Sequence, residues 1–166
     1  MIDIPEGVEV EIDAGKVVVK GKIGKLEKDF HIKGIKIEKK NGNIEISGGA
    51  NKTDLVLINT IKSHLKNMFE GVTSGFSHKL QIVYSHFPMN PEVKGNELII
   101  KNFLGEKKPR RAKIIGDTKI EIKGQELVVS GASKEDVGQT CANICNATKI
   151  PKKDSRVFQD GIYLVE

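Results

Sequence analysis

The sequence lacks several features that mark whole classes of protein. It has no tryptophan, two cysteines and five prolines, and aromatic residues make up only 5% of its 166 residues. Two cysteines cannot form the disulfide framework of a small secreted domain, which indicates a reducing, cytoplasmic setting. The longest uninterrupted apolar run spans residues 55–58, whereas a membrane-spanning helix needs about 20 apolar residues. Residues 1–6 also lack the basic start and apolar stretch of a secretory signal, so we expect neither export nor a membrane partner.

The composition that remains is typical of a globular protein. Hydrophobic residues make up 38% of the chain and charged residues 30%, which excludes the disordered and fibrous classes. The length allows one domain of ordinary size or two domains of about eighty residues each. A net charge of +5 is only weak support for an acidic partner. The order of the residues is therefore more informative than their totals.

The sequence contains an internal duplication. When the chain is shifted by 83 positions, residues 36–48 fall on residues 119–131, and six of these thirteen pairs are identical. After a two-residue deletion, residues 17–20 fall on residues 98–101. Similar hairpin composition could produce such matches independently, but the register is kept across several elements. The chain is therefore interpreted as two tandem repeats.

Each repeat reads as the same series of strands followed by a helix. Alternating and β-branched residues predict strands at 8–12, 17–19, 35–38, 44–46, 79–84, 120–122 and 127–129. Turns at residues 14–15 and 41–42 join the first two pairs of strands. Apolar residues at helical spacing follow in each half, Leu57 to Phe69 in the first and Val137 to Cys145 in the second. We expect an α+β fold of two tandem domains, residues 1–82 and 83–166, each an antiparallel sheet packed against one helix.

The sequence offers little support for catalysis or metal binding. Cys141 and Cys145 share a helix face, but the chain has no further cysteine and no histidine at ligand spacing from them, so core packing is the favoured interpretation. His64 and His86 have no Ser, Cys or Asp placed by a local motif as a nucleophile–base partner. No nucleotide-binding fingerprint occurs. We expect no enzyme, no metal, no cofactor and no small-molecule substrate.

Positive charge is gathered into two short segments of the second half. Residues 101–113 carry six basic residues and one acidic residue, and residues 149–156 carry four and one. Gly105 and Pro109 indicate a loop between two strands, which we expect to carry Lys107, Lys108, Arg110 and Arg111. The rest of residues 84–166 has a net charge of −5. Phe158 and Tyr163 follow the second segment and offer stacking surfaces. A solvated charged surface is the alternative, but two such segments against an acidic background favour RNA binding.

Four stretches of the chain resemble one known family. They are Gly-Val-Thr-Ser-Gly-Phe at residues 71–76, Val-Tyr-Ser-His-Phe-Pro at 83–88, Asn-Phe-Leu-Gly-Glu-Lys at 102–107 with Arg110 and Arg111, and residues 153–163. In this order they resemble the ribosomal large-subunit protein L-six family, in its archaeal and eukaryotic branch. The resemblance covers nearly the whole chain and includes the tandem repeat.

The resemblance implies a structural constituent of the large ribosomal subunit, with a role in translation on cytoplasmic ribosomes. It implies binding to large-subunit ribosomal RNA, mainly through the second domain, near the stalk base and the factor-binding region. Ribosomal proteins at the stalk base would be its neighbours. The expected RNA-binding residues are Lys101, Lys107, Lys108, Arg110, Arg111, Lys149, Lys152, Lys153, Arg156 and Tyr163.

Two other functions remain open from the sequence. The chain could be a non-ribosomal protein-interaction module associated with the translation apparatus, which would bind a protein partner without RNA. It could also be an enzyme that uses His64 or His86, although no substrate can be named. Residues 16–40 have a net charge of +6 and are a candidate for a secondary RNA contact.

Overall fold

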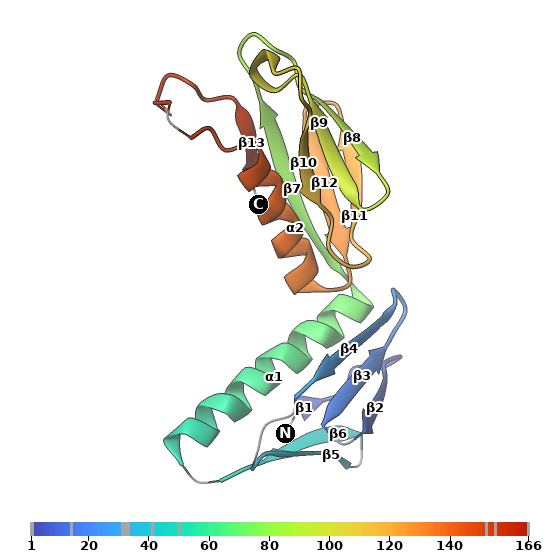
Figure 1. The fold of residues 1–166 in the computed structure, drawn as a ribbon. Coiled ribbons are helices and arrows are strands. Elements are labelled where there is room, and N and C mark those ends of the chain that lie inside the picture. The colour runs from blue at the N-terminus through green and yellow to red at the C-terminus, as the bar shows by residue number, and fades with distance from the viewer. Residues whose placement is uncertain are drawn as a thin grey trace. The chain divides into compact units, whose positions relative to one another are not determined.

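The computed structural model describes residues 2–13, 15–30, 34–40, 42–49, 51–151, 153–154 and 156–165. Unit 1 comprises Met1–Gly75 and Ala132–Lys134, and unit 2 comprises Phe76–Gly131 and Glu135–Glu166. Both units combine strands and a helix, as Figure 1 shows, so the α+β class is confirmed. The boundary expected between residues 82 and 83 falls inside β7 (Phe76–Val83), because this whole strand pairs with strands of unit 2.

Unit 1 consists of two three-stranded antiparallel sheets and one long helix. The sheets have the orders β2-β3-β4 and β1-β6-β5. The strands are β1 (Ile2–Asp3), β2 (Glu9–Asp13), β3 (Lys16–Lys20), β4 (Lys25–Asp29), β5 (Lys36–Lys40) and β6 (Asn43–Ser47). Val17 and Val19 on β3 are fully buried and belong to the same core as Leu65 of the helix. The alternation of the strands therefore directs one face of the sheet toward the helix.

Helix α1 (Lys52–Thr73) packs through the apolar stripe that the sequence predicts. Its buried residues include Ile58, Ile61, Leu65, Met68, Phe69 and Val72. These positions recur every three or four residues and therefore lie on one face of the helix. The helix ends where the amides of Ser74 and Gly75 both donate to the carbonyl of Glu70, at 2.9 and 3.1 Å. Gly75 has φ 75°, a conformation that favours glycine and stops the helix.

Unit 2 repeats this plan with an additional strand. Its sheets have the orders β10-β9-β8 and β11-β12-β7-β13. The elements that follow β7 are β8 (Asn90–Lys94), β9 (Glu97–Lys101), the short 3-10 helix η1 (Phe103–Gly105), β10 (Arg110–Lys113), β11 (Lys119–Lys123), β12 (Glu126–Gly131), α2 (Lys134–Ala147) and β13 (Gly161–Leu164). β13 has no counterpart among the described residues of unit 1.

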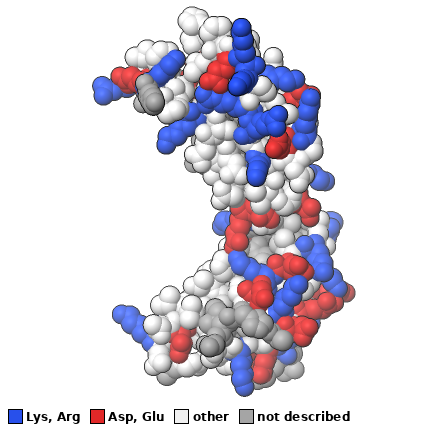
Figure 2. Space-filling model, viewed as in Figure 1, with Lys and Arg blue, Asp and Glu red and all other residues white. Residues whose placement is uncertain are grey.

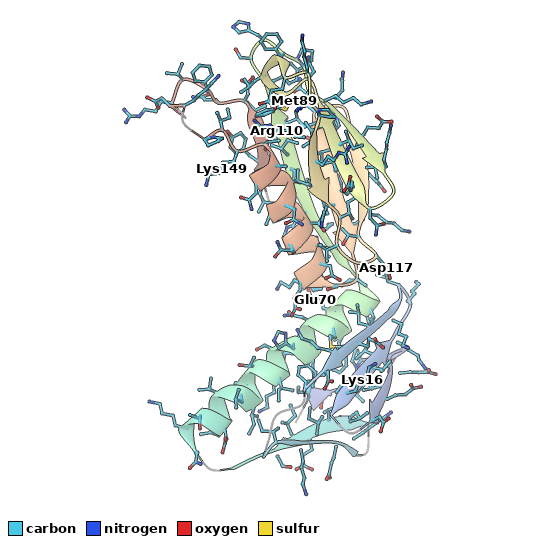
Figure 3. The ribbon with its side chains drawn as sticks, in the orientation of Figure 1. Lys16, Glu70, Met89, Arg110, Asp117 and Lys149 are labelled. Atoms are coloured by element: carbon cyan, nitrogen blue, oxygen red, sulfur yellow. The ribbon has the colours of Figure 1, made fainter. Side chains whose placement is uncertain are left out.

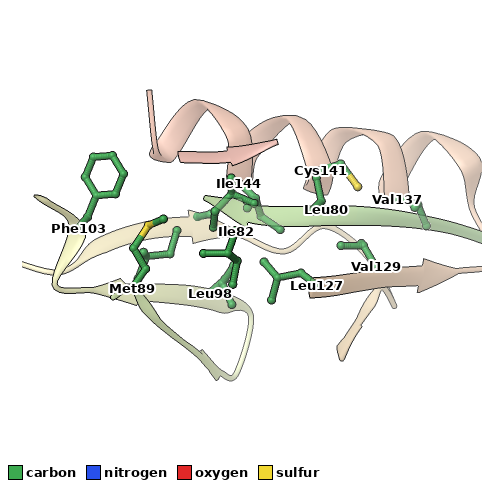
Figure 4. Packing of buried hydrophobic residues seen from close by; sticks show 13 residues of the cluster. Leu80, Ile82, Met89, Leu98, Phe103, Leu127, Val129, Val137, Cys141 and Ile144 are labelled. Carbon is green, nitrogen blue, oxygen red and sulfur yellow. The ribbon is translucent and has the colours of Figure 1, made fainter. Parts of the chain in front are cut away.

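The core of unit 2 lies between α2 and the strands. Val137, Cys141 and Ile144 of α2 point toward Leu80 of β7 and Val129 of β12, as Figure 4 shows. The expectation that Cys141 packs in the core is confirmed, since only 4% of it is exposed. Burial raises the pKa of the Cys141 thiol to about 11, so the thiol stays protonated and unreactive at neutral pH.

One ion pair repeats between the two units. Lys20 Nζ lies 2.6 Å from Glu11 Oε1, and Lys101 Nζ lies 2.6 Å from Glu92 Oε2. Each pair joins the two strands of a hairpin, and the alignment with the two-residue deletion places Lys20 on Lys101. The duplication therefore extends from backbone topology to a specific pair of side chains.

Several strands, including β4 and β10, lie outside the ranges predicted from the sequence patterns, and one expectation about the basic residues is corrected. β4 and β10 each form the edge of a three-stranded sheet. The strands of each unit form two sheets rather than the single sheet expected. Arg110 and Arg111, expected in a loop, lie on β10. These short edge strands carry one apolar residue each, Leu26 and Ala112, which is too few for a period-two signal. Of the expected turns, Ala14 and Asn41 lie outside the described residues.

Candidate nucleic-acid interface

The connection between β9 and β10, residues 102–109, has an unusual backbone conformation and is called the basic loop below. Among the described non-glycine residues only Asn102 and Leu104 have positive φ, 59° and 49°, and Gly105 follows with φ 75°. The Asn102 side-chain amide donates to the carbonyl of Pro88 at 3.1 Å. Phe103, between the two positive-φ residues, is 1% exposed and belongs to the core of unit 2. A buried anchor thus fixes the start of a loop whose later residues face solvent.

The lysines of the basic loop are exposed. Lys107 and Lys108 follow Glu106, and within the described residues neither has a carboxylate partner within 4 Å. Arg111 projects from β10 with 66% of its side chain exposed and lies 3.8 Å from Glu97. Lys101, in contrast, is held by Glu92. The cations with most freedom to meet a partner therefore lie beyond the end of β9.

The second basic segment, residues 149–159, is closed at both ends by buried polar residues. Thr148 Oγ1 accepts a hydrogen bond from the amide of Ile162 at 3.1 Å, and Asp160 Oδ1 accepts one from the amide of Ser85 at 3.1 Å. Thr148 is 3% exposed and Asp160 is 7% exposed. The segment therefore leaves and rejoins the core at fixed points, in the manner of an Ω-loop. We call it the basic segment.

Inside the basic segment a local turn presents the cations. Asp154 Oδ1 accepts from the amide of Arg156 at 2.9 Å, and the Asp154 carbonyl accepts from the amide of Phe158. Lys153 Nζ lies 4.4 Å from the centre of the Phe158 ring, and the Arg156 side chain is 92% exposed. Lys149 is also exposed. Lys152 lies outside the described residues.

Tyr163 closes the far end of the segment. Its hydroxyl donates to the carbonyl of Gln159 at 3.1 Å. A Cβ atom on Gly161 would lie only 3.0 Å from the Tyr163 ring, so the ring covers the backbone where glycine stands. Tyr163 is half exposed, and this leaves part of its ring open to a stacking partner.

Arg110 brings the two basic regions together. Its Nε and Nη2 donate to the two carboxylate oxygens of Glu106 at 2.9 and 2.6 Å. Its Nη1 donates to the carbonyls of Ala147 and Lys149, both at 3.0 Å. The guanidinium also lies 4.1 Å from the centre of the Phe103 ring. Figure 3 shows Arg110 and Lys149 close together, so residues separated by 39 positions share one region of unit 2.

The same region perturbs Glu106. The hydrogen bond from Arg110 holds the pKa of the Glu106 carboxyl below its usual value, and the nearby charge of Lys153 lowers it further. A cation of the basic segment is therefore close enough to act on a carboxylate of the basic loop. Figure 2 shows Lys and Arg gathered over this part of unit 2, whereas Asp117 lies at the opposite end of the unit in Figure 3.

These two regions, together with the neighbouring strand β10, define a basic surface on unit 2. Its exposed cations are Lys107, Lys108, Arg111, Lys149, Lys153 and Arg156. The residues that position them were not expected from the sequence: Phe103 as an anchor, Glu106 as the partner of Arg110, and Thr148 and Asp160 as closures. The spacing of Glu106 and Arg110 is the one sequence signal that could have indicated a pair.

The cations of unit 1 have different surroundings. Lys16 and Lys25 on neighbouring strands lie 3.2 and 3.9 Å from the same Glu27 carboxylate oxygen. Lys20 pairs with Glu11 as described above. Lys39 donates to the carbonyl of Val10 at 3.2 Å. Much of the positive charge expected to make a secondary contact is therefore held within its own sheets.

Other candidate sites receive little structural support. Within the described ranges, no three His, Cys, Asp or Glu residues come together as a possible metal site. His64 packs in unit 1, with its ring 6.1 Å from that of Phe30, whereas His86 is exposed in unit 2. No helix in the described part of the chain is long and apolar enough to cross a membrane.

Comparison with known proteins identifies the family. The family model described as ribosomal protein L6 matches residues 4–75 and 87–161, one segment in each repeat. A relative from the archaeon Methanosarcina mazei is named large ribosomal subunit protein uL6 and is 51% identical to this chain. The alignment covers 99% of this chain and 94% of that protein. The resemblance expected from the four sequence stretches is confirmed. The chain therefore belongs to the ribosomal protein L6 family, whose members are structural, non-enzymatic components of the ribosome.

Proposed function

We propose that the chain is a structural constituent of the large ribosomal subunit and binds large-subunit rRNA through the basic surface of unit 2. The observation that carries this proposal is the joining of two exposed basic regions by Arg110. A single cluster of surface lysines is usually only a solvated face. Two clusters held together on closed, anchored loops are suited to a fixed, polyanionic partner.

The chemistry of this surface suits the RNA backbone. Lys107, Lys108, Lys149 and Lys153 present ammonium groups that neutralise phosphates as point charges, and Arg111 and Arg156 can grip phosphates in a fork. Lys152 lies in the same segment and is assigned the same role. Tyr163 offers a partly open ring to a base, and Lys101 contributes at the margin. Such a surface reads the shape of a folded RNA rather than its sequence.

The family resemblance extends the proposal to a location. We place the chain near the stalk base and the factor-binding region of cytoplasmic ribosomes, with ribosomal proteins as neighbours. Chemical crosslinking of assembled large subunits, with the crosslinked nucleotides and peptides identified, tests this placement. Crosslinks from unit 2 to rRNA outside that region would contradict it.

Salt dependence of RNA binding tests the proposed surface directly. The probe is an in vitro transcript of the Methanosarcina mazei large-subunit rRNA. Removal of one cation that neutralises a phosphate reduces the slope of log affinity against log salt concentration by about 0.7–0.9. Lys107→Ala with Lys108→Ala should therefore lower the slope by about 1.4–1.8 and weaken binding at least about tenfold at 0.1 M salt.

The matched control is Lys16→Ala with Lys25→Ala, because these lysines already share Glu27 in unit 1. It removes the same formal charge and should change the slope little. Equal effects of the two double variants would contradict the assignment of the site to unit 2. A chain that binds ribosomal proteins stably but not rRNA would instead support the protein-interaction module.

A further inference from the structure

We propose that Arg110 is a positioning residue, which joins the basic loop and the basic segment into one preformed RNA-binding surface and does not itself bind phosphate. The proposal rests on the RNA-binding function proposed above. It separates Arg110 from the other cations of the two regions, with which sequence reasoning had grouped it.

The hydrogen-bonding capacity of Arg110 is almost fully used inside unit 2. A guanidinium has five N–H donors, and four hydrogen bonds to Glu106, Ala147 and Lys149 engage four of them. Phe103 covers the guanidinium at 4.1 Å, and only 23% of the side chain is exposed. A bidentate grip on phosphate needs two parallel donors, and Arg110 has one donor left.

The partners of Arg110 come from both sides of the surface. Glu106 belongs to the basic loop, and the Lys149 carbonyl belongs to the basic segment. Ala147 is the last residue of α2, whose carbonyl is among those without a partner inside the helix. The sequence of α2 has no basic residue in its last turn. Arg110 therefore supplies from β10 the positive charge that favours a helix C-terminus.

Unit 1 contains a simpler form of the same link. The connection between β3 and β4 is attached to the end of α1 by the amide of Ile23, which donates to the Val72 carbonyl at 3.0 Å. A Cβ atom on Gly21 would lie 2.6 Å from the Val72 side chain, so that connection lies directly against the helix. In unit 2 the longer basic loop occupies this place, and the Arg110 side chain makes the attachment. The same link between connection and helix end thus occurs in both repeats.

The strained backbone of the basic loop supports a role in preorganisation. Positive φ at Leu104 is unfavourable for a bulky side chain, and persists only where surrounding contacts enforce it, whereas Asn102 adopts positive φ more readily. Arg110 contacts Phe103 between these two residues and Glu106 just after them. Without Arg110, we expect the loop and segment to keep their charges and to lose their fixed spacing. RNA would then have to order them on binding, at a cost in affinity.

The slope of log affinity against log salt concentration distinguishes a positioning role of Arg110 from direct contact with phosphate. It is measured for rRNA binding by the full chain, using the same Methanosarcina mazei transcript. Arg110→Ala should weaken binding about tenfold or more, since ordering several side chains costs roughly that much. The slope should stay at the wild-type value, because the same phosphates are neutralised in the complex. Arg110→Lys should restore part of the affinity. A slope reduced by about 0.7–0.9 would show direct phosphate contact and overturn the proposal, as would unchanged affinity.

Glu106→Ala gives a second test, in which simple charge attraction and the positioning role of Arg110 predict opposite changes in RNA affinity. It removes a negative charge beside the basic surface, so simple charge attraction predicts tighter RNA binding. The positioning role predicts weaker binding, because Arg110 loses two of its hydrogen bonds. Tighter binding by this variant would overturn the proposal even if Arg110→Ala failed to fold.

Amide hydrogen exchange separates local loosening from global unfolding. In Arg110→Lys and Glu106→Ala, exchange should accelerate at the backbone amides of positions 106 and 149, which donate to the carbonyls of Phe103 and Asn146. Exchange at Ile82, bonded to Gln125 within the sheet region, should not change. Unchanged exchange at positions 106 and 149 would contradict the link. If Lys107→Ala with Lys108→Ala also leaves the salt slope unchanged, the RNA-binding function itself fails, which is a different outcome.

Discussion

The two repeats share a scaffold and differ in their connections. Residues 21–24 join β3 to β4 in unit 1, whereas residues 102–109 join β9 to β10 in unit 2. The helices also differ in length. Helix α1 continues to Thr73, whereas the shorter α2 ends at Ala147 and is followed by the basic segment. Both basic regions of unit 2 therefore lie where the second repeat departs from the first.

This difference shows why the lysines of the two repeats differ in their availability to a binding partner. Lysines on the strands of unit 1 face glutamates on neighbouring strands, and they pair across the sheet. Such exposed pairs add little stability, but they occupy the cations. Lysines on the longer connections of unit 2 have no opposing strand to supply a carboxylate. Loops on a rigid scaffold can therefore keep cations free for a partner more readily than paired strands can.

The largest stability effect should come from the anchor of the basic loop. Phe103 aligns with Lys22 of unit 1, and Phe103 is buried where Lys22 is exposed. Phe103→Ala should lower the free energy of unfolding of unit 2 by about 3–5 kcal/mol, from lost burial and a residual cavity. Chemical denaturation followed by amide exchange measures this loss. Lys22→Ala is the control and should cost less than about 0.5 kcal/mol; similar losses would show that the two connections are equivalent after all.

A smaller effect should come from Gly161, at the start of the strand that only unit 2 shows in the described residues. Gly161→Ala places a methyl group about 3.0 Å from the Tyr163 ring, and overpacking of this kind costs about 1–3 kcal/mol. The matched control is Gly138→Ala in α2, where a Cβ atom meets nothing within 4 Å. It should stabilise by about 0.5–1 kcal/mol, because alanine favours the helix. Thermal unfolding of the two variants should shift in opposite directions, and a stabilising Gly161→Ala would contradict the described contact.

The smallest effect on stability should be the loss of the Glu106–Arg110 interaction at acid pH. Interaction with Arg110 lowers the pKa of Glu106 from 4.5, so the pair contributes its full stabilisation above that value, where the unfolded carboxyl is also ionised. As the pH falls below 4.5 and through the lower folded pKa, the carboxyl is protonated and this contribution is lost. The stability difference between wild type and Glu106→Gln should therefore shrink as the pH falls below 4.5 and through the lower folded pKa. A difference that grows on acidification would reverse the assigned sign.

Glu11 and Glu92 allow the repeated ion pair to be tested in the same titration. Hydrogen bonds from Lys20 and Lys101 lower the pKa values of Glu11 and Glu92, respectively. NMR titration of both carboxyls should give pKa values below 4.5, and Lys20→Ala should raise only that of Glu11. Equal responses at both sites would contradict the local pairing.

Much of the fold and part of the site could be predicted from the residues. The shift of 83 positions, the alternating strands and the apolar helix stripes depend on local order, which a sequence displays directly. The positions of the two basic regions also follow from counting charges along the chain. The edge strands β4 and β10 could not be predicted, because hydrogen bonds to a neighbouring strand define them rather than their own side chains.

The sequence by itself determined that this protein is one small α+β unit written twice, with two clusters of positive charge in the second copy. Only the tertiary structure decided which cations are exposed and which are engaged. Arg110 and Lys107 look alike in sequence, yet the carbonyls that engage Arg110 lie 37 and 39 residues along the chain. Hydrogen bonds between such distant groups depend on how the whole unit packs, so no local pattern records them.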